Sequence, residues 1–200
     1  MTRSEKKRAA IMEAGTRIFL EKGFDNASMD EIAAAAEVSK RTVYSHFGSK
    51  EELFSRVMYE TCEAKCAFLC SIMDLDIPVG EALTLLGRGF LDMLFDPQSI
   101  MMIRAMTVNA GHDQTAAQGF IEQGPKNSSR MLADYLEEQT RRGKLKVGKP
   151  DLAAQSFMSS LFGYRQIESL VVEGAAPTPE EREAMVNNAV EIFLYGVVGR

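Results

Sequence analysis

The sequence predicts an all-α protein, and three observations carry this prediction. Apolar residues recur at three- and four-residue spacing along most of the 200 residues, which is the period of an amphipathic helix. The alternation of a half-buried strand is hard to find, and tryptophan is absent. Capping signals, glycines and prolines separate the periodic segments. With 46% apolar residues, the chain can bury a real core in one or two small domains.

The first two helices are predicted near the N-terminus. One runs from about Ser4 to Lys22, because apolar residues recur there at helical spacing and Gly23 follows in the position that ends helices. A short second helix begins at Ser28, whose hydroxyl forms a capping box with Glu31 three residues later.

A third short helix follows a tight turn and begins at its cap, Ser39. Val43 and Phe47, one turn apart, form its predicted buried seam. A step of roughly 100° per residue gives the outward face Arg41 and Ser45 at its centre and Thr42 and Tyr44 on its flanks. This basic, hydroxyl-rich face without apolar residues suits a polyanionic groove.

The stretch RAAIMEAGTRIFLEKGFDNASMDEIAAAAEVSKRTVYSHFGSKEELF resembles the N-terminal DNA-binding domain of TetR-family transcriptional regulators. The resemblance covers about fifty residues without a gap and ends in VSK-x-TVY-x-HF-x-SKEEL. It implies a three-helix DNA-binding domain with a helix-turn-helix in residues 1–50. Residues 51–200 are then expected to form a ligand-binding and dimerisation domain of five to six helices.

The expected partner of the first domain is a double-stranded DNA operator. By resemblance, Thr42, Tyr44, Lys50 and the N–H groups at the start of the next helix would hold phosphates. The full set of predicted DNA-binding residues is Ser28, Ser39, Lys40, Arg41, Thr42, Tyr44, Ser45, His46 and Lys50.

Two positions depart from the family pattern, and the role of a third stays open. Glu37 stands where relatives commonly have glycine, so we expect a positive φ that costs on the order of 1 kcal/mol. Arg41 also replaces a frequent glycine, and it is left open between a base contact, a phosphate contact and solvent. His46 either contacts a phosphate or steadies the turn with a hydrogen bond.

The net charge of −5 does not argue against DNA, because the charge is divided along the chain. Residues 1–50 carry nine Lys and Arg against seven Asp and Glu, whereas residues 51–200 carry fourteen against twenty-one. A local basic face is what phosphate binding requires.

A long connecting helix is predicted from about Lys50 to Asp74. It carries Cys62, Cys66 and Cys70, each one turn after the last. The three cysteines are either sensors of thiol-reactive compounds or metals, or small packing residues in a reducing cytosol. No metal site and no cofactor is predicted.

Five further segments complete the predicted helices. Pro78 ends the connecting helix, and Gly124-Pro125 interrupts one of the later segments. The segments are Val79–Phe95, Gln98–Ala110, Gln114–Arg142, Asp151–Glu173 and Thr178–Val198.

The pattern EQGP…YLEEQTRRGKLKVGKPDLAAQSF is similar to the AefR-type C-terminal domain of the same family. This similarity implies a small-molecule effector between the connecting helix and the helices after it. The candidate ligand residues, each of which has a core role as its alternative, are Phe68, Phe90, Met102, Met106, Phe120, Gln123 and Phe157.

The resemblance also implies a homodimer in which the last two helices of each subunit form a four-helix bundle. Paired recognition helices read two half-sites about 34–36 Å apart. Some of the candidate interface residues must instead face the core of their own subunit; the candidates are Phe162, Gly163, Gln166, Leu170, Val190, Phe193 and Leu194.

Other classes of protein lack support in the sequence. No run approaches the ~20 apolar residues that cross a bilayer, and the charged start is no signal peptide, so a cytoplasmic protein is expected. An enzyme is not expected, because no Gly-rich phosphate loop, His-Glu-x-x-His or G-x-S-x-G occurs. We therefore expect a repressor that binds a near-palindromic operator and is released by a small apolar or amphipathic effector.

Overall fold

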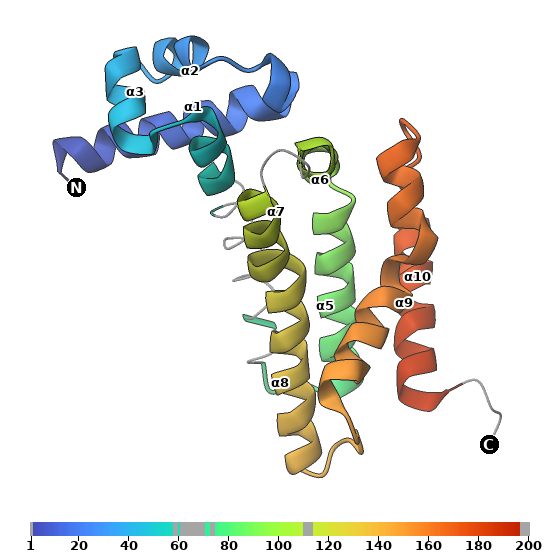
Figure 1. Ribbon diagram of the computed structural model, residues 1–200. Coiled ribbons are helices and arrows are strands. Elements are labelled where there is room, and N and C mark those ends of the chain that lie inside the picture. Colours follow the sequence, from blue (N-terminus) through green and yellow to red (C-terminus); the bar gives the residue numbers. More distant parts are fainter. Residues whose placement is uncertain (1, 58–59, 61–70, 73–74, 110–113, 197–200) are drawn as a thin grey trace. The chain divides into compact units, whose positions relative to one another are not determined.

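The computed structural model describes residues 2–57, 60, 71–72, 75–109 and 114–196 (Figure 1). In these residues every regular element is a helix, which confirms the all-α fold class. The chain divides into two compact units. The first gathers the described residues of Met1–Glu63 and Met101–Gln123, and the second those of Ala64–Ile100 and Gly124–Arg200.

Three helices begin the first unit: α1 (Arg3–Asn26), α2 (Met29–Ala35) and α3 (Lys40–Phe47). Thr2 caps α1 in a capping box with Glu5. Gly23, at φ 77°, breaks the helical path of α1 where the sequence predicts its end. Residues 50–57 begin the predicted connecting helix, of which residues 60 and 71–72 are also described.

The turn between α2 and α3 carries the strain that the sequence predicts. Glu37 has a φ of 53°, a left-handed conformation that side chains with a Cβ seldom adopt. The N–H of Glu37 donates to the Ala34 carbonyl and that of Val38 to the Ala33 carbonyl, at 3.2 and 3.0 Å. These bonds end α2 and turn the chain toward α3.

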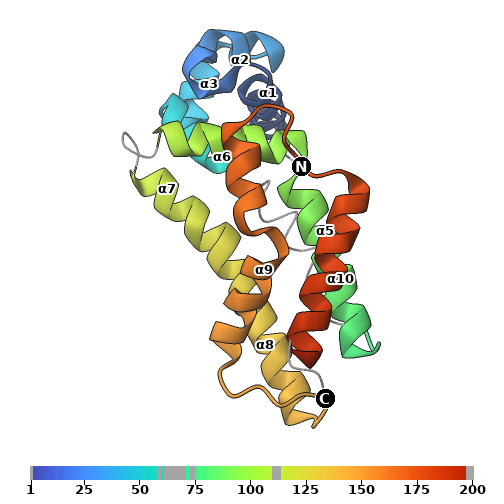
Figure 2. The same cartoon turned by 90° about the vertical axis from the view of Figure 1, so that its right-hand side faces the viewer.

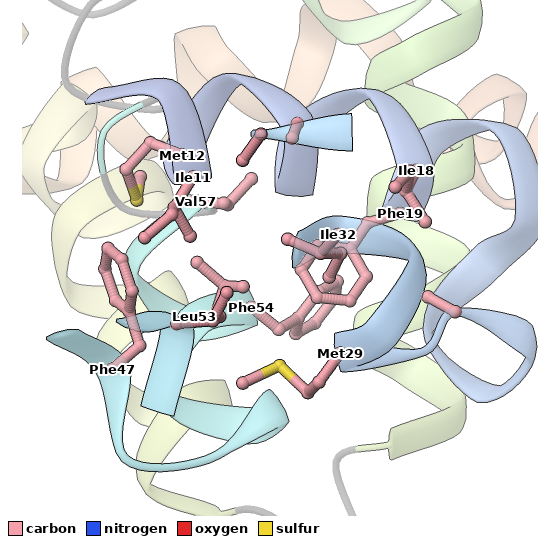
Figure 3. Close-up of a cluster of buried hydrophobic side chains, with 14 of the residues drawn as sticks. Ile11, Met12, Ile18, Phe19, Met29, Ile32, Phe47, Leu53, Phe54 and Val57 are labelled. Atoms are coloured by element: carbon pink, nitrogen blue, oxygen red, sulfur yellow. The ribbon is translucent and has the colours of Figure 1, made fainter. Parts of the chain in front are cut away.

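The core of the first unit joins the three N-terminal helices to the connecting helix (Figure 3). Ile11, Ile32, Val43 and Leu53 are fully buried there. The rings of Phe19, Phe24 and Phe54 contact one another, with centroids 4.9–6.1 Å apart. This core buries one side of α3 and leaves its opposite side exposed to solvent.

The first unit also contains most of α6 (Pro97–Asn109) and all of α7 (Gln114–Ile121). Met102 and Met106 of α6 belong to the buried cluster of the first unit, and Phe120 of α7 packs against that cluster. Three side chains predicted to bind a ligand thus contribute to the core of the first unit.

The described residues of the second unit include four long helices: α5 (Val79–Leu94), α8 (Asn127–Arg141), α9 (Pro150–Val171) and α10 (Pro179–Tyr195). Figures 1 and 2 both show them alongside one another. α9 packs against α8, α10 and α5, and α10 packs against α5. Their shared interior is apolar, with fully buried Leu83, Leu132, Leu136, Phe157 and Leu161.

Two of these helices are interrupted. Gly124 and Pro125 lie in a π-helical turn, Glu122–Lys126, that separates α7 from α8 where the sequence predicts a break. Gly163 breaks α9 with φ 43° and ψ −134°, a break that the sequence analysis did not predict. No described helix has the length and apolar character needed to cross a bilayer.

Candidate nucleic-acid interface

α3 presents one polar face because its opposite side is anchored. Val43 and Phe47 are buried at 0% and 3% exposure, as predicted. The Ser39 hydroxyl accepts a hydrogen bond from the N–H of Thr42 at 3.2 Å and caps the start of the helix. Gly48 ends the helix at φ 57°. The outer face is therefore held at both ends.

Arg41, Tyr44 and Ser45 form the exposed centre of this face. Within the described residues the Arg41 guanidinium forms no ion pair or hydrogen bond, and the Tyr44 hydroxyl forms no hydrogen bond. Tyr44 is 43% exposed. Both side chains are thus available to an anionic partner.

The shorter hydroxyl side chains are engaged within α3 itself. The Ser39 and Thr42 hydroxyl oxygens lie 2.8 Å apart, and the Ser45 hydroxyl donates to the Thr42 carbonyl at 2.8 Å. A hydroxyl can donate one hydrogen bond and accept two. These groups therefore keep part of their hydrogen-bonding capacity.

Lys40 ties α3 to α2 through an ion pair. Its ammonium lies 2.9 Å from the Asp30 carboxylate, and both side chains are more than half exposed. The hydrogen bond to Asp30 raises the pKa of Lys40, so the side chain stays charged. An exposed pair of this kind is weak, which leaves Lys40 able to exchange Asp30 for a phosphate.

Lys50 is more deeply engaged than the other basic residues. Its ammonium donates to the carbonyls of Phe24 and Ala27 at 2.8 and 3.2 Å, and it lies 4.3 Å from the centre of the Phe24 ring. These contacts join the start of the connecting helix to the connection between α1 and α2. A phosphate contact by Lys50 stays a prediction.

Ser28 and His46 are half buried. The Ser28 hydroxyl accepts the Glu31 N–H at 3.1 Å, and the Glu31 carboxylate accepts the Ser28 N–H at 3.3 Å, which is the predicted capping box. The His46 ring lies against that of Phe47, with centroids 6.3 Å apart. Their contacts to DNA stay predictions.

A cluster of ion pairs that the sequence analysis missed links α1 to the connecting helix and contacts the buried Phe47 of α3. Glu60 accepts hydrogen bonds from Arg8 of α1 at 2.9 Å and from Arg56 at 3.0 Å, and the Arg8 guanidinium lies 5.5 Å from the Phe47 ring centre. Burial works to raise the pKa of Glu60, but the hydrogen bonds from the two arginines outweigh it and lower that pKa. The i,i+4 spacing of Arg56 and Glu60 was the available signal.

The described members of the predicted ligand set belong to both units. Phe90 and Phe157 lie in the interior of the second unit, where their rings contact those of Phe162 and Phe193. Met102, Met106 and Phe120 instead contribute to the core of the first unit. Phe68, the side chain of Gln123 and the three cysteines Cys62, Cys66 and Cys70 lie outside the described residues.

The predicted interface residues all lie in the second unit, and most of them are buried or half buried there. Val190 is 8% exposed, Phe162 and Phe193 make the ring contacts just described, and Leu194 packs over Gly80. Only Gly163 of the seven is exposed; Gln166 and Leu170 are half buried. Helical spacing alone does not tell an inward stripe from an outward one.

The exposed apolar side chains of α9 and α10 are different residues, which the sequence analysis missed. Ile167 is 65% and Val171 78% exposed, one turn apart on α9. We call the outward set the apolar face; its members are Tyr164, Ile167, Val171, Ile192 and Tyr195. Within the described part of the chain, no cluster of three or more His, Cys, Asp or Glu could hold a metal ion.

Comparison with known proteins gives consistent matches over both units. Residues 11–57 match the family described as bacterial regulatory proteins, tetR family. Residues 81–196 match the C-terminal domain of AefR-like transcriptional repressors.

Individual proteins agree with these family matches. UidR of Escherichia coli, a transcriptional regulator, is 36% identical over 149 residues, which span 72% of this chain and 70% of UidR. A TetR-family structure from Mesorhizobium loti superimposes with a TM-score of 0.92 at 30% identity, over 97% of this chain and 98% of that one. The flavonoid-responsive regulator FrrA gives 0.71 at 31% identity, over 95% and 96%. The chain belongs to the TetR family of transcriptional regulators.

Proposed function

We propose that this regulator is a ligand-responsive repressor that binds a near-palindromic operator as a homodimer and releases it when an effector binds. DNA binding is assigned to residues 1–50, and ligand binding and dimerisation to residues 51–200. The observation that carries the proposal is the outer face of α3. It presents an arginine without an ion-pair or hydrogen-bond partner among the described residues and an exposed tyrosine, opposite a buried apolar seam.

The residues of this face divide by the contact that each can make. Arg41, at the centre, can donate two hydrogen bonds to the O6 and N7 atoms of a guanine. Tyr44, Thr42 and Lys40 lie where neutral or cationic donors would meet phosphate oxygens, which fix the register of a protein on DNA. We therefore assign sequence reading to Arg41 and positioning to the other three.

The apolar face supports the homodimer. α9 and α10 pack against each other and expose aliphatic and aromatic side chains that a second copy of the same surface would bury. Gln166 and Leu170, half buried beside this face, are the sequence-predicted residues that we keep in the interface. A dimer brings two copies of α3 to successive major grooves.

We assign effector binding to the interior of the second unit, where Phe90 and Phe157 lie. An effector there shifts the protein toward a conformation that does not fit DNA, in proportion to its differential affinity for the two conformations. Because FrrA is named as flavonoid-responsive, planar phenolic compounds are the first effectors to test. The chain is thus proposed to act by binding and not by catalysis.

The proposal is tested by selection from a randomised DNA duplex pool with the full-length protein. We expect enrichment of a near-palindrome whose half-site centres lie about one helical turn, or a multiple of it, apart. Its affinity should fall steeply with salt, because cationic side chains release counterions from phosphates. A pool without enrichment, or an affinity insensitive to salt, would contradict the assignment of α3 as the recognition helix.

A further inference from the structure

A cavity of about 500 Å³ lies within the second unit and belongs to none of the sites described so far. It is bordered by the last turns of α8, by residues 75–77 just before α5, and by Arg142 and Lys144 just after α8. None of the residues predicted to bind the effector lines it. Its volume is within the range of small-molecule sites.

Two buried polar side chains face this cavity. Tyr135 and Gln139, one turn apart on α8, are 8% and 7% exposed. Within the described residues neither the phenol nor the side-chain amide has a hydrogen-bond partner. Neither side chain has a polar atom that is both buried and without a partner, so the phenol and the amide are accessible at the cavity and can each form a hydrogen bond with an occupant.

The backbone around this pair is already satisfied. The Gln139 carbonyl accepts hydrogen bonds from the N–H groups of Lys144 and Leu145 at 2.9 and 3.3 Å. The last turn of α8 and the loop after it are therefore fixed in place. Burial raises the pKa of Tyr135, against a smaller opposing effect of Arg142, so the phenol is a neutral donor.

The remaining uncharged lining is apolar. Met131 lies one turn before Tyr135 on α8, and Leu75 and Ile77 come from the segment before α5. Methionine adapts to ligands of irregular shape. An occupant thus meets apolar side chains from both segments and two hydrogen-bonding groups on α8.

The charged side chains at the rim nearly balance. Glu138 accepts hydrogen bonds from both Arg141 and Arg142, and Lys144 lies 3.8 Å from Asp76. Asp134 adds one exposed carboxylate. Because the cations are paired with carboxylates of the same unit, the rim does not favour an anionic occupant.

We propose that this cavity is a second small-molecule site, which takes a neutral molecule with an apolar body and at least one hydroxyl or carbonyl group. Its hydroxyl or carbonyl pairs with Tyr135 and Gln139, and its apolar body lies against Met131, Leu75 and Ile77. This inference goes beyond the proposed function, because it concerns binding alone and needs neither an operator nor a dimer.

The test compares two probes of nearly the same shape, 2-naphthol and naphthalene, on the full-length protein. Calorimetry or competition gives each Kd, and methionine-methyl NMR locates the probe, because Met131 is one of twelve methionines and lines the cavity. The test variant is Tyr135→Phe with Gln139→Leu. The matched control is Gln155→Leu, which makes the same amide-to-leucine change at an exposed position of α9 outside every site proposed so far.

We expect 2-naphthol to shift the Met131 methyl signal of the unaltered protein. In the test variant its Kd should rise about tenfold, the size of one or two lost hydrogen bonds. Naphthalene should bind the test variant and the unaltered protein within about twofold, and the control should behave as the unaltered protein. An unmoved Met131 signal, an unchanged Kd for 2-naphthol, or equal weakening of both probes would overturn the proposal.

Discussion

Arg41 is the residue on which sequence reading by this protein is proposed to depend. Its neighbours on α3 are engaged: Lys40 pairs with Asp30, and the hydroxyls of Thr42 and Ser45 bond within the helix. The guanidinium of Arg41 has no such partner among the described residues. It can therefore bind a base without first breaking an internal contact.

Replacing Arg41 with alanine should lower specificity at one or two base pairs. The loss in discrimination should be about 1–3 kcal/mol, because a bidentate contact to guanine is removed. Competition between the selected operator and single-base variants measures it. Arg41→Lys keeps the charge but not the planar fork and should lose most of the same discrimination.

Tyr44→Phe should weaken binding to all DNA sequences alike. A changed base preference in that variant would reverse the roles assigned to Arg41 and Tyr44.

Glu37 adopts an unfavourable backbone conformation, with positive φ, in the turn between α2 and α3. Replacing it with glycine should stabilise the protein by up to about 1 kcal/mol, because glycine adopts φ 53° without a Cβ clash, less the backbone entropy that glycine adds to the unfolded chain. Urea unfolding measures the change. Glu37→Ala keeps the Cβ and should bring no gain, so equal stabilisation by alanine would disprove the strain.

At the scale of elements, specific residues at the helix ends determine where several helices begin and end. Thr2, Ser28 and Thr178 each begin a helix with a capping box, and Gly48 ends α3. α8 ends differently, with Arg141 and Arg142 held on Glu138 one turn earlier. Cations near a helix C-terminus also complement its dipole.

The end of α8 should respond to acid. Hydrogen bonds from Arg141 and then from Arg142 lower the pKa of Glu138 from 4.5 to about 2. A carboxyl whose pKa is lower in the folded state stabilises the fold above its unfolded pKa, and that contribution is lost as the pH falls.

The free energy of unfolding of the unaltered protein should therefore exceed that of Glu138→Gln above pH 4.5. The difference should disappear as the pH falls to about 2. It should be small, because the pair is exposed to solvent. Denaturant titrations across this pH range measure it. Glu137→Gln is the control, since Glu137 forms no ion pair within the described residues; a difference that grows toward low pH would contradict the sign.

At the scale of the whole molecule, the apolar face of α9 and α10 is the feature that a single chain leaves unexplained. Ile167 and Val171 expose aliphatic side chains one turn apart on α9, and Ile192 and Tyr195 expose an aliphatic and an aromatic side chain on α10. Apolar side chains exposed in this way are available to an interaction partner. The proposed homodimer accounts for this exposure.

Ile167→Glu should therefore weaken the dimer at least about tenfold, because the change buries a charge in an apolar interface. Sedimentation velocity over a concentration series measures the effect, and operator binding should weaken in parallel. Leu152→Glu is the matched control: Leu152 is 54% exposed on the same helix, outside the apolar face. Equal weakening by both variants, or by neither, would remove the apolar face from the interface.

The sequence by itself determined the elements and the DNA-facing helix. Capping boxes, helix-ending glycines and the seam of Val43 and Phe47 are local features that depend on residues three or four positions apart. The positive φ of Glu37 was predicted from the resemblance, because related turns commonly have glycine at this position. The outward direction of Arg41 and Tyr44 follows from the helical period alone.

Only the tertiary structure decided which apolar stripe faces which neighbour. Helical periodicity marks Val190 and Phe193 as readily as Ile167 and Val171. Only packing within the second unit buries Val190 and sets the Phe193 ring against Phe157, while Ile167 and Val171 stay exposed. Met102, Met106 and Phe120 joined the core of the first unit for the same reason. A helix carries its apolar pattern in its sequence, whereas the partner that covers each face comes from residues far away along the chain.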